Sequence, residues 1–177
     1  SEMCIRDSHY ALHEGSAGAG RTRGGFGLDY ELELRNGNAK ASFVMDHGRF
    51  GPQGALGGGD GDVNKVVVFR DGESYVPLHL SKEQDIPLET GDRVWVRTPG
   101  GGGYGDPLQR SAALVLEDVR LERYTIEQAA DLYGVVLLVS TGSEGNHGLT
   151  LDEIATEARR ATLRACLLYT SPSPRDP

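Results

Sequence analysis

The stretch Thr98-Pro99-Gly100-Gly101-Gly102-Gly103-Tyr104-Gly105-Asp106-Pro107 divides the chain into two parts that differ in hydrophobic periodicity. Before it, apolar residues recur at every second position, a pattern typical of half-buried β-strands. After it, they recur at every third or fourth position, as in amphipathic helices. A run of strands followed by helices predicts an α+β fold. We therefore expect a β-rich body of antiparallel hairpins with glycine-rich loops, followed by two to three carboxy-terminal helices.

The first part contains five predicted strands. Residues 28–35 alternate strictly, and Asn36-Gly37 then favours a two-residue hairpin turn, so residues 39–46 are expected to return as the pairing strand. The β-branched run 63–69 predicts a buried strand. Asp71-Gly72 predicts a second hairpin, with residues 74–76 as the returning strand. Residues 93–98 alternate again, and the intervening stretch 77–87 is expected to be irregular.

The second part is predicted to be mainly helical. Residues 111–122 form a helix whose apolar face holds Ala112, Val115, Leu116 and Val119. Thr125 and Gln128 fit a capping box that opens a short helix ending at Gly134. Residues 135–139 resemble a last strand, followed by a polar loop over 140–148. A second capping box, Thr150 with Glu153, predicts a final helix with an inward face of Leu151, Ile154, Ala155, Ala158 and Thr162.

Bulk properties exclude several classes of protein. The 177 residues carry a formal net charge of −8, which argues against binding to nucleic acid, where clustered Lys and Arg are needed. No apolar run approaches a membrane span, and no secretory signal is visible. We expect a cytoplasmic protein without a membrane partner.

The two ends of the chain share an unusual relation. One nucleotide string, read on opposite strands, can encode both the start SEMCIRDS and the tail from Cys166, and it resembles the adapter of transposase-based sequencing libraries. We therefore expect residues 1–8 and 166–177 to be foreign, and residues 9–165 to be the carboxy-terminal part of a larger domain. Both cysteines, Cys4 and Cys166, lie in these ends, so no disulfide, thiol nucleophile or cysteine metal site is expected.

Several glycine-rich stretches resemble, in order and spacing, those of hydantoinase B/oxoprolinase subunits. The similarity covers nearly all of residues 9–165. Its parts are Gly18 to Gly27, with the pattern Gly-Arg-x-Arg-Gly-Gly-x-Gly; Gly51 to Gly59; Gly91-Asp92-Arg93-Val94; the four-glycine run ending in Asp106-Pro107; Glu117-Asp118-Val119; and Tyr133 to Leu137.

The resemblance implies a role in ATP-dependent opening of a cyclic amide such as a hydantoin or 5-oxoproline. A hydantoinase A-type partner would bind ATP and Mg²⁺ and phosphorylate the amide oxygen, and the B-type subunit would complete hydrolysis within a hetero-oligomer. Related complexes carboxylate ketones such as acetone or acetophenone and hold a divalent metal in an amino-terminal part that residues 9–165 do not include. We expect no cofactor on this stretch itself. A non-catalytic, β-rich assembly module is a third hypothesis.

The four-glycine run offers three interpretations. Gly100, Gly102 and Gly105 formally fit a dinucleotide-binding pattern, but no βαβ unit surrounds them and no Lys-Ser/Thr pair follows, which disfavours a nucleotide site. The glycines could instead let another backbone segment approach closely. Alternatively, the N–H groups of residues 100–103 (Gly100, Gly101, Gly102, Gly103) could face an anionic intermediate. Asp106 is a binding candidate, although an N-cap for a helix begun by Pro107 is the simpler role.

The remaining candidates are basic. Arg21 and Arg23 could clamp a carboxylate or phosphate, or form an interdomain salt bridge. Arg49 is a further binding candidate, and His47 is a conceivable acid/base group. The five histidines show no paired helical spacing, so no metal ligands are expected in this stretch.

Overall fold

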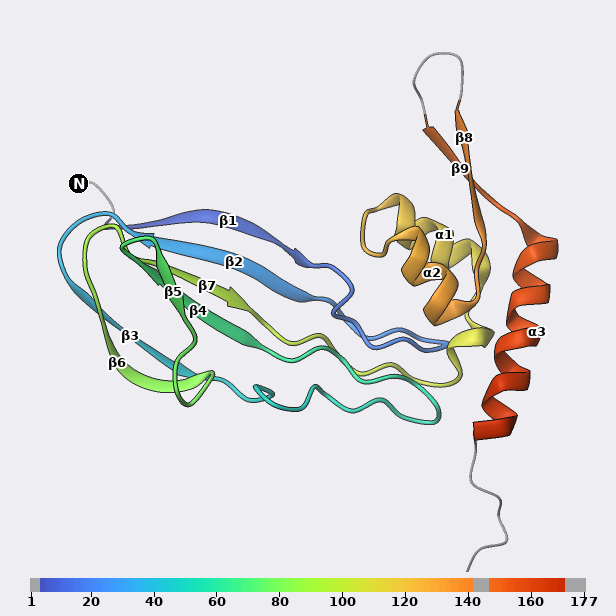
Figure 1. The fold of residues 1–177 in the computed structure, drawn as a ribbon, viewed down its shortest axis with the longest axis horizontal. Coiled ribbons are helices and arrows are strands. Elements are labelled where there is room, and N and C mark those ends of the chain that lie inside the picture. Colours follow the sequence, from blue (N-terminus) through green and yellow to red (C-terminus); the bar gives the residue numbers. More distant parts are fainter. Residues whose placement is uncertain (1–3, 142–146, 171–177) are drawn as a thin grey trace, which may run out of the picture.

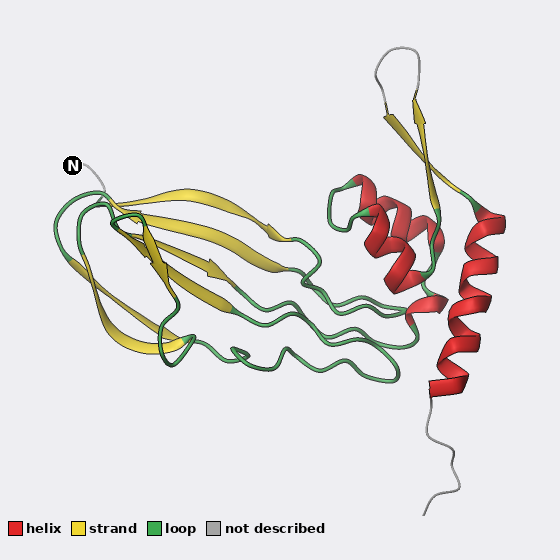
Figure 2. Ribbon diagram, in the orientation of Figure 1, coloured by secondary structure: helices red, strands yellow, loops and turns green. Residues whose placement is uncertain are grey.

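The structure, a computed structural model, describes residues 4–141 and 147–170. The molecule is elongated (Figure 1), with most strands at one end and the helices, together with a last pair of strands, at the other. Long loops run between the two ends (Figure 2). The α+β class and the order of strands before helices are confirmed.

The larger sheet contains five antiparallel strands in the order β1-β2-β7-β4-β5. Its inner face buries Val66, Val68, Val94 and Val96, as the alternation predicted. The bounds are β1 (Ile5–His13), β2 (Gly27–Leu34), β4 (Lys65–Arg70), β5 (Glu73–Tyr75) and β7 (Arg93–Arg97).

A two-stranded antiparallel sheet, β3 (Ala39–Val44) with β6 (Lys82–Leu88), packs on that inner face. Ile86 of β6 is buried against the valines, and Ala41, Phe43 and Leu88 pack beside it. The two sheets therefore form a small sandwich with one shared core.

One hairpin predicted from the sequence is wrong and another is confirmed. The chain crosses at Asn36-Gly37 from the large sheet to the small one, so residues 28–35 and 39–46 do not pair with each other. Only Gly37 of this dipeptide takes a positive φ, of 81°, whereas a type I′ turn needs two. The crossing places the apolar face of β3 against that of the large sheet. At Asp71-Gly72 both φ values are positive, 49° and 82°, and β4 pairs with β5.

The expected irregular stretch 77–87 is also corrected, because its second half forms β6. Pro87 lies inside this strand opposite Lys40. Proline cannot donate to a ladder and is found on edge strands, and β6 has a partner on one side only. Pro87 therefore weakened the sequence signal for a strand in this stretch.

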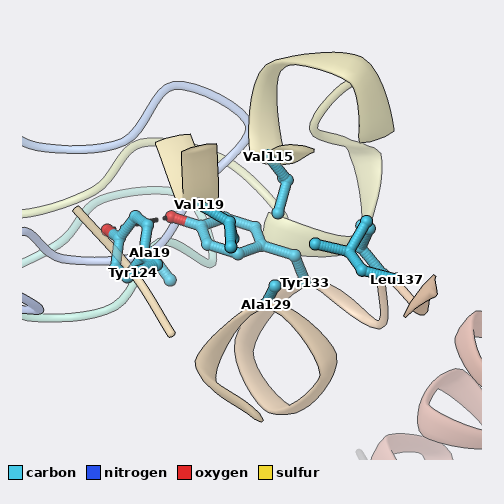
Figure 3. Packing of buried hydrophobic residues seen from close by; sticks show 8 residues of the cluster. Ala19, Val115, Val119, Tyr124, Ala129, Tyr133 and Leu137 are labelled. Carbon is cyan, nitrogen blue, oxygen red and sulfur yellow. Dashed lines mark hydrogen bonds between the residues drawn. The ribbon is translucent and has the colours of Figure 1, made fainter. Parts of the chain in front are cut away.

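The first helices lie close to where the sequence predicted them. The helices are a 3₁₀ turn η1 (Pro107–Gln109), α1 (Ala112–Arg120) and α2 (Ile126–Tyr133). The capping box of Thr125 and Gln128 is present, and Gly134 ends α2 with φ 62°. Figure 3 shows the core of this end, in which Tyr133 lies among Val115, Val119 and Ala129 and its hydroxyl donates to that of Tyr124.

The last elements confirm the prediction in part. The expected strand over 135–139 corresponds to β8 (Leu137–Thr141), and the expected final helix to α3 (Glu153–Thr170). The loop expected over 140–148 is too long, because β9 (His147–Leu151) begins inside it and pairs with β8. The second capping box is wrong because Thr150 belongs to β9; Asp152 caps the helix instead, accepting from the Ala155 N–H at 2.9 Å. Residues 142–146 of the expected loop lie outside the described residues.

The predicted inward face of α3 is wrong too. Ile154 is 85% exposed, whereas Thr156 is 4% exposed. Two arginines hold the helix to the rest of the molecule: Arg159 donates to the Ala130 carbonyl and Arg160 to those of Tyr133 and Arg110. Polar contacts with helix-end carbonyls, rather than an apolar stripe, therefore fix its orientation.

The amino-terminal residues take part in the sandwich. Ile5 to Ser8 belong to β1, and the Ser8 hydroxyl donates to Glu31 at 2.8 Å. α3 likewise runs past Cys166. The fold thus gives no support to the expectation that residues 1–8 and 166–177 are foreign. Within the described ranges, no helix has the length and apolar character needed to cross a membrane.

We predict that Tyr133→Ala lowers the unfolding free energy by about 3–5 kcal/mol, because it removes a fully buried ring. It also ends the hydrogen-bonded chain from Tyr133 through Tyr124 to the Ala17 carbonyl. Denaturant melts would measure the change. The neighbouring Leu132→Ala, at a 38% exposed position, is the control, and an equal loss for both would contradict this packing.

Candidate functional site

A bundle of glycine-rich segments connects the sandwich to the helices. We call the five segments 15–20, 22–27, 51–55, 58–62 and 98–105 the glycine bundle. They form the side-by-side loops at the centre of Figure 2. Their backbone hydrogen bonds run between segments. Buried N–H and C=O groups need partners, so this cross-linking replaces the ladder of a regular sheet.

Segment 98–105 is the centre of the bundle, because it is hydrogen-bonded to all four others. Each bond joins backbone atoms at about the ideal distance: Gly101 N–H to Gly25 O at 2.8 Å, Gly103 N–H to Gly59 O at 2.8 Å, Gly18 N–H to Gly101 O at 2.8 Å, and Ala55 N–H to Gly103 O at 2.9 Å. The run therefore sits in the middle of the bundle rather than in a turn.

Side chains are excluded from the middle of the bundle by close backbone contact. A Cβ placed on Gly100 would lie 1.9 Å from the Ser16 carbonyl oxygen, and one on Gly102 would lie 2.1 Å from that of Gln53. For Gly103 the distance to Ala19 O is 2.0 Å. Real Cβ atoms do not come so close, so the glycines allow close packing of backbones, as one interpretation predicted. In the part of the chain that the structure describes, the sheets are antiparallel and contain no βαβ unit, which agrees with the argument against a dinucleotide site.

Few backbone N–H groups of residues 100–105 lack a hydrogen-bond acceptor. Those of Gly101, Gly103, Tyr104 and Gly105 donate to backbone carbonyls. Within the residues that the structure describes, only Gly100 and Gly102 of residues 100–105 make no such bond. An anion site built from residues 100–103 stays a prediction, with these two donors as its basis.

Arg23 ties the glycine bundle to the helices. Its guanidinium makes two bonds to Asp118 of α1, with Nε at 3.0 Å from Oδ2 and Nη2 at 3.2 Å from Oδ1. Arg110 and Arg123 also donate to this carboxylate, which is 3% exposed. The salt-bridge alternative is thus the arrangement present for Arg23, and Asp118 is the partner that sequence reasoning missed. The sequence had marked Asp118 only as part of the Glu117-Asp118-Val119 resemblance, and nothing in it paired this carboxylate with Arg23.

Charge dominates the titration of Asp118. Burial by itself would raise the pKa of this carboxyl, but the hydrogen bonds and charges of Arg23, with those of Arg123 and Arg110, bring it below the usual value. The carboxylate stays ionised at neutral pH and holds three cations at the junction.

Arg21 behaves differently from Arg23. Its backbone N–H donates to Gly105 O, but its exposed side chain has no hydrogen bond or ion pair among the described residues. Asp106 accepts from the Leu108 N–H at 2.8 Å, which confirms its role as the N-cap of η1. Of these two candidates, only Arg21 has a side chain without any polar partner among the described residues, whereas Asp106 uses Oδ1 as a helix cap.

A second cluster of candidates lines a pocket of about 520 Å³ where the sandwich meets the bundle. Residues 45–50 and 79–82 form its wall, so His47 and Arg49 come together with His79 and Lys82. His47 and Leu80 both adopt left-handed φ, 66° and 57°, a strained backbone that is concentrated at functional sites. His79 was missed because β6 brings it there from far along the chain. The roles of His47 and Arg49 stay predictions.

Polar contacts define what this pocket offers. Lys82 is paired with Asp46 at 2.6 Å, and the His47 ring nitrogen Nδ1 lies 3.2 Å from Phe50 O. The Lys82 ion pair lowers the pKa of Asp46. Arg49 has no polar partner among the described residues. Across those residues, no three His, Cys, Asp or Glu side chains gather in the manner of metal ligands.

Comparison with known sequences shows which proteins this chain resembles. Residues 2–107 match the model of the family described as hydantoinase B/oxoprolinase. Caprolactamase subunit beta of Pseudomonas jessenii is 39% identical over 160 residues, 86% of this chain and 25% of that subunit. The 5-oxoprolinase of Saccharomyces cerevisiae is 30% identical over 96 residues, 54% of this chain and 7% of that protein.

Two solved structures superpose well on this chain. The crystal structure of the ATP-dependent caprolactamase from Pseudomonas jessenii superposes with a TM-score of 0.69 at 33% identity over 89% of this chain and 26% of that one. Nucleotide-free acetone carboxylase gives 0.67 over 96% of this chain and 26% of its own, at 22% identity, which shows a shared fold.

The chain therefore belongs to the hydantoinase B/oxoprolinase family. It spans about a quarter of the length of the caprolactamase subunit that it matches. The family match begins at residue 2, so it too gives no support to a foreign amino-terminal end.

We predict that Gly102→Ala destabilises the fold by about 1–3 kcal/mol or more, since its Cβ would overlap Gln53 O. Gly25→Ala is the matched control, because its Cβ would have no atom within 4 Å. Thermal melts of both variants measure the difference. Equal melting temperatures would mean that the central segment is not packed in this way.

We predict that Asp118→Asn lowers the unfolding free energy by about 3–5 kcal/mol at neutral pH, because three arginines lose a buried counter-charge. The folded pKa lies below the unfolded one, so this contribution is present above the unfolded pKa of about 4 and is lost as pH falls through the folded value. The difference from wild type should shrink in acid.

Urea melts between pH 3 and pH 7 test this dependence. Asp131→Asn is the control, because its ion pair with Arg159 involves a carboxylate that is 72% exposed. A wild-type advantage that grows on acidification would rule out the assigned direction.

Proposed function

We propose that this chain is part of the B-type subunit of an ATP-dependent hydrolase of cyclic amides, with hydantoins or 5-oxoproline as the substrate class. The observation that carries the proposal is the 39% identity to caprolactamase subunit beta over 86% of the chain, which takes in the sandwich, the glycine bundle and the helices. Caprolactam and 5-oxoproline are both cyclic amides, so the named relatives share one type of bond.

The proposed reaction needs a second subunit. A hydantoinase A-type partner would bind ATP and Mg²⁺ and transfer the terminal phosphoryl group to the amide oxygen. That step would make the ring carbon a better electrophile, and water would add to it. The ring C–N bond would then break as the nitrogen takes a proton, and a second water would hydrolyse the resulting acyl phosphate to the carboxylate and inorganic phosphate. The B-type subunit completes hydrolysis in a cytoplasmic hetero-oligomer. A divalent metal, where present, would be held by a part of the subunit other than this chain.

Within this scheme the glycine bundle acts as a rigid support beside the reacting groups. Arg21, whose backbone N–H donates to Gly105 O, provides an unengaged cation next to segment 98–105. The N–H groups of Gly100 and Gly102, which have no backbone acceptor, belong to that segment. Charge-assisted bonds from such donors stabilise anionic intermediates. Binding to nucleic acid or to a membrane has no place in the scheme, given the net charge of −8.

A ketone carboxylase subunit is the second candidate function. It is favoured by the superposition with acetone carboxylase over 96% of the chain. Activation of a ketone oxygen by phosphorylation uses the same first step as activation of an amide oxygen. A non-catalytic assembly role is the third, and the engagement of most polar groups in the bundle is consistent with it.

The complete subunit, produced with its A-type partner, tests these alternatives. We expect ADP release to depend on a hydantoin or on 5-oxoproline and to match the ring-opened product mole for mole. ADP release that requires a ketone and bicarbonate would favour the carboxylase. Turnover by the A-type partner without this subunit would favour the assembly role.

Variants of the same complex separate binding from folding. We expect Arg21→Ala to lower kcat/KM about tenfold or more, as for loss of one charged hydrogen bond. Arg35→Ala is the control, because Arg35 is also exposed and its side chain has no polar partner among the described residues. Equal activity of the two variants would remove Arg21 from the site.

A further inference from the structure

One row of side chains across the large sheet shows that its inner face is only half covered. Tyr10, Tyr30, Val96 and Val66 lie opposite one another on β1, β2, β7 and β4. The residues at one end, Val66 and Val96, are each 1% exposed, whereas Tyr10 at the other end is 68% exposed. Leu12, two positions on along β1, is 48% exposed. The small sheet therefore covers β4 and β7 but leaves β1 bare.

Strand spacing explains the gap. Neighbouring strands lie about 4.8 Å apart, so two strands cannot cover the width of five. β3 pairs with β6 on one side and has no strand on the other in the described part of the chain. An edge of this kind presents unpaired N–H and C=O groups that favour pairing with another strand.

A groove marks the place where such a strand would lie. It has a volume of about 190 Å³, and its lining includes consecutive residues 39–43 of β3. Successive side chains of a strand point to opposite faces, so a groove that meets all five runs along the edge of the strand. Its other wall comes from the large sheet and includes Leu32 and the buried Leu34 of β2 and Ile5 of β1, which is 50% exposed.

We propose that a β-strand from the remainder of the subunit pairs with the free edge of β3 and covers Tyr10 and Leu12. Its chemistry is that of a half-buried strand, with apolar residues at alternate positions facing β1 and β2. The length of chain outside this structure supports this occupant over others, because the matched region is 25% of caprolactamase subunit beta. Exposed aromatic and aliphatic side chains beside an open edge mark an interaction surface. The proposal holds whichever reaction the complex performs.

Hydrogen exchange of the 177-residue chain and of the complete subunit tests the proposal. We expect backbone amides in residues 39–44 to exchange at least tenfold more slowly in the complete subunit. In that subunit, Leu12→Asp should remove the added protection and lower Tm. Leu114→Asp is the matched control, since Leu114 of α1 has the same 48% exposure on another surface.

Three results would overturn the proposal. The first is equal exchange of residues 39–44 in both proteins. The second is an equal effect of Leu12→Asp and Leu114→Asp. The third is protection that appears in the 177-residue chain alone as its concentration rises and is lost with Leu12→Asp, which would assign the face to a second copy of this chain.

Discussion

Close backbone contact along segment 98–105 is the constraint on which the rest of the structure depends. Every other segment of the glycine bundle is hydrogen-bonded to this one, and a single Cβ at Gly100 or Gly102 would overlap a neighbouring carbonyl. A bundle without side chains buries little apolar surface, and glycine loses more conformational freedom on folding than any other residue. The bundle therefore has to be held from both ends by cores that do bury apolar surface.

The two ends supply that support in different ways. The sandwich buries valines from β4 and β7 against Ile86. The helices form a compact core around Tyr133, and the Tyr124 hydroxyl donates to Ala17 O within the bundle. Asp118 adds a charged tie to Arg23. These contacts fix the central segment relative to the helices, so the polar groups beside it, Arg21 among them, are presented by a rigid support. A site that stabilises a short-lived anion gains from such preorganisation.

The surface of the chain carries one apolar region that the described residues leave uncovered. Exposed apolar residues are normal when scattered, but Tyr10 and Leu12 lie on the same strand, β1, as Ile5, which lines the groove along β3. The chain has one well-covered half of a sandwich and one bare half. Caprolactamase subunit beta is about four times as long as the region that it shares with this chain, and we propose such additional chain as the source of a covering strand.

The sequence by itself determined the class of the fold, four of the five strands of the large sheet (β2, β4, β5 and β7), the first two helices and the caps of α2, because these depend on periodicity and on local hydrogen bonds. It did not predict β1, whose place in the sheet comes from its pairing with β2. It also marked the glycine runs as sites of close approach. Only the tertiary structure decided that β3 leaves Asn36-Gly37 for a second sheet, that α3 is held by arginines, that Arg23 meets Asp118, and that His79 joins His47. Each of these pairs residues far apart in the chain, where the free energy comes from packing that no local pattern records.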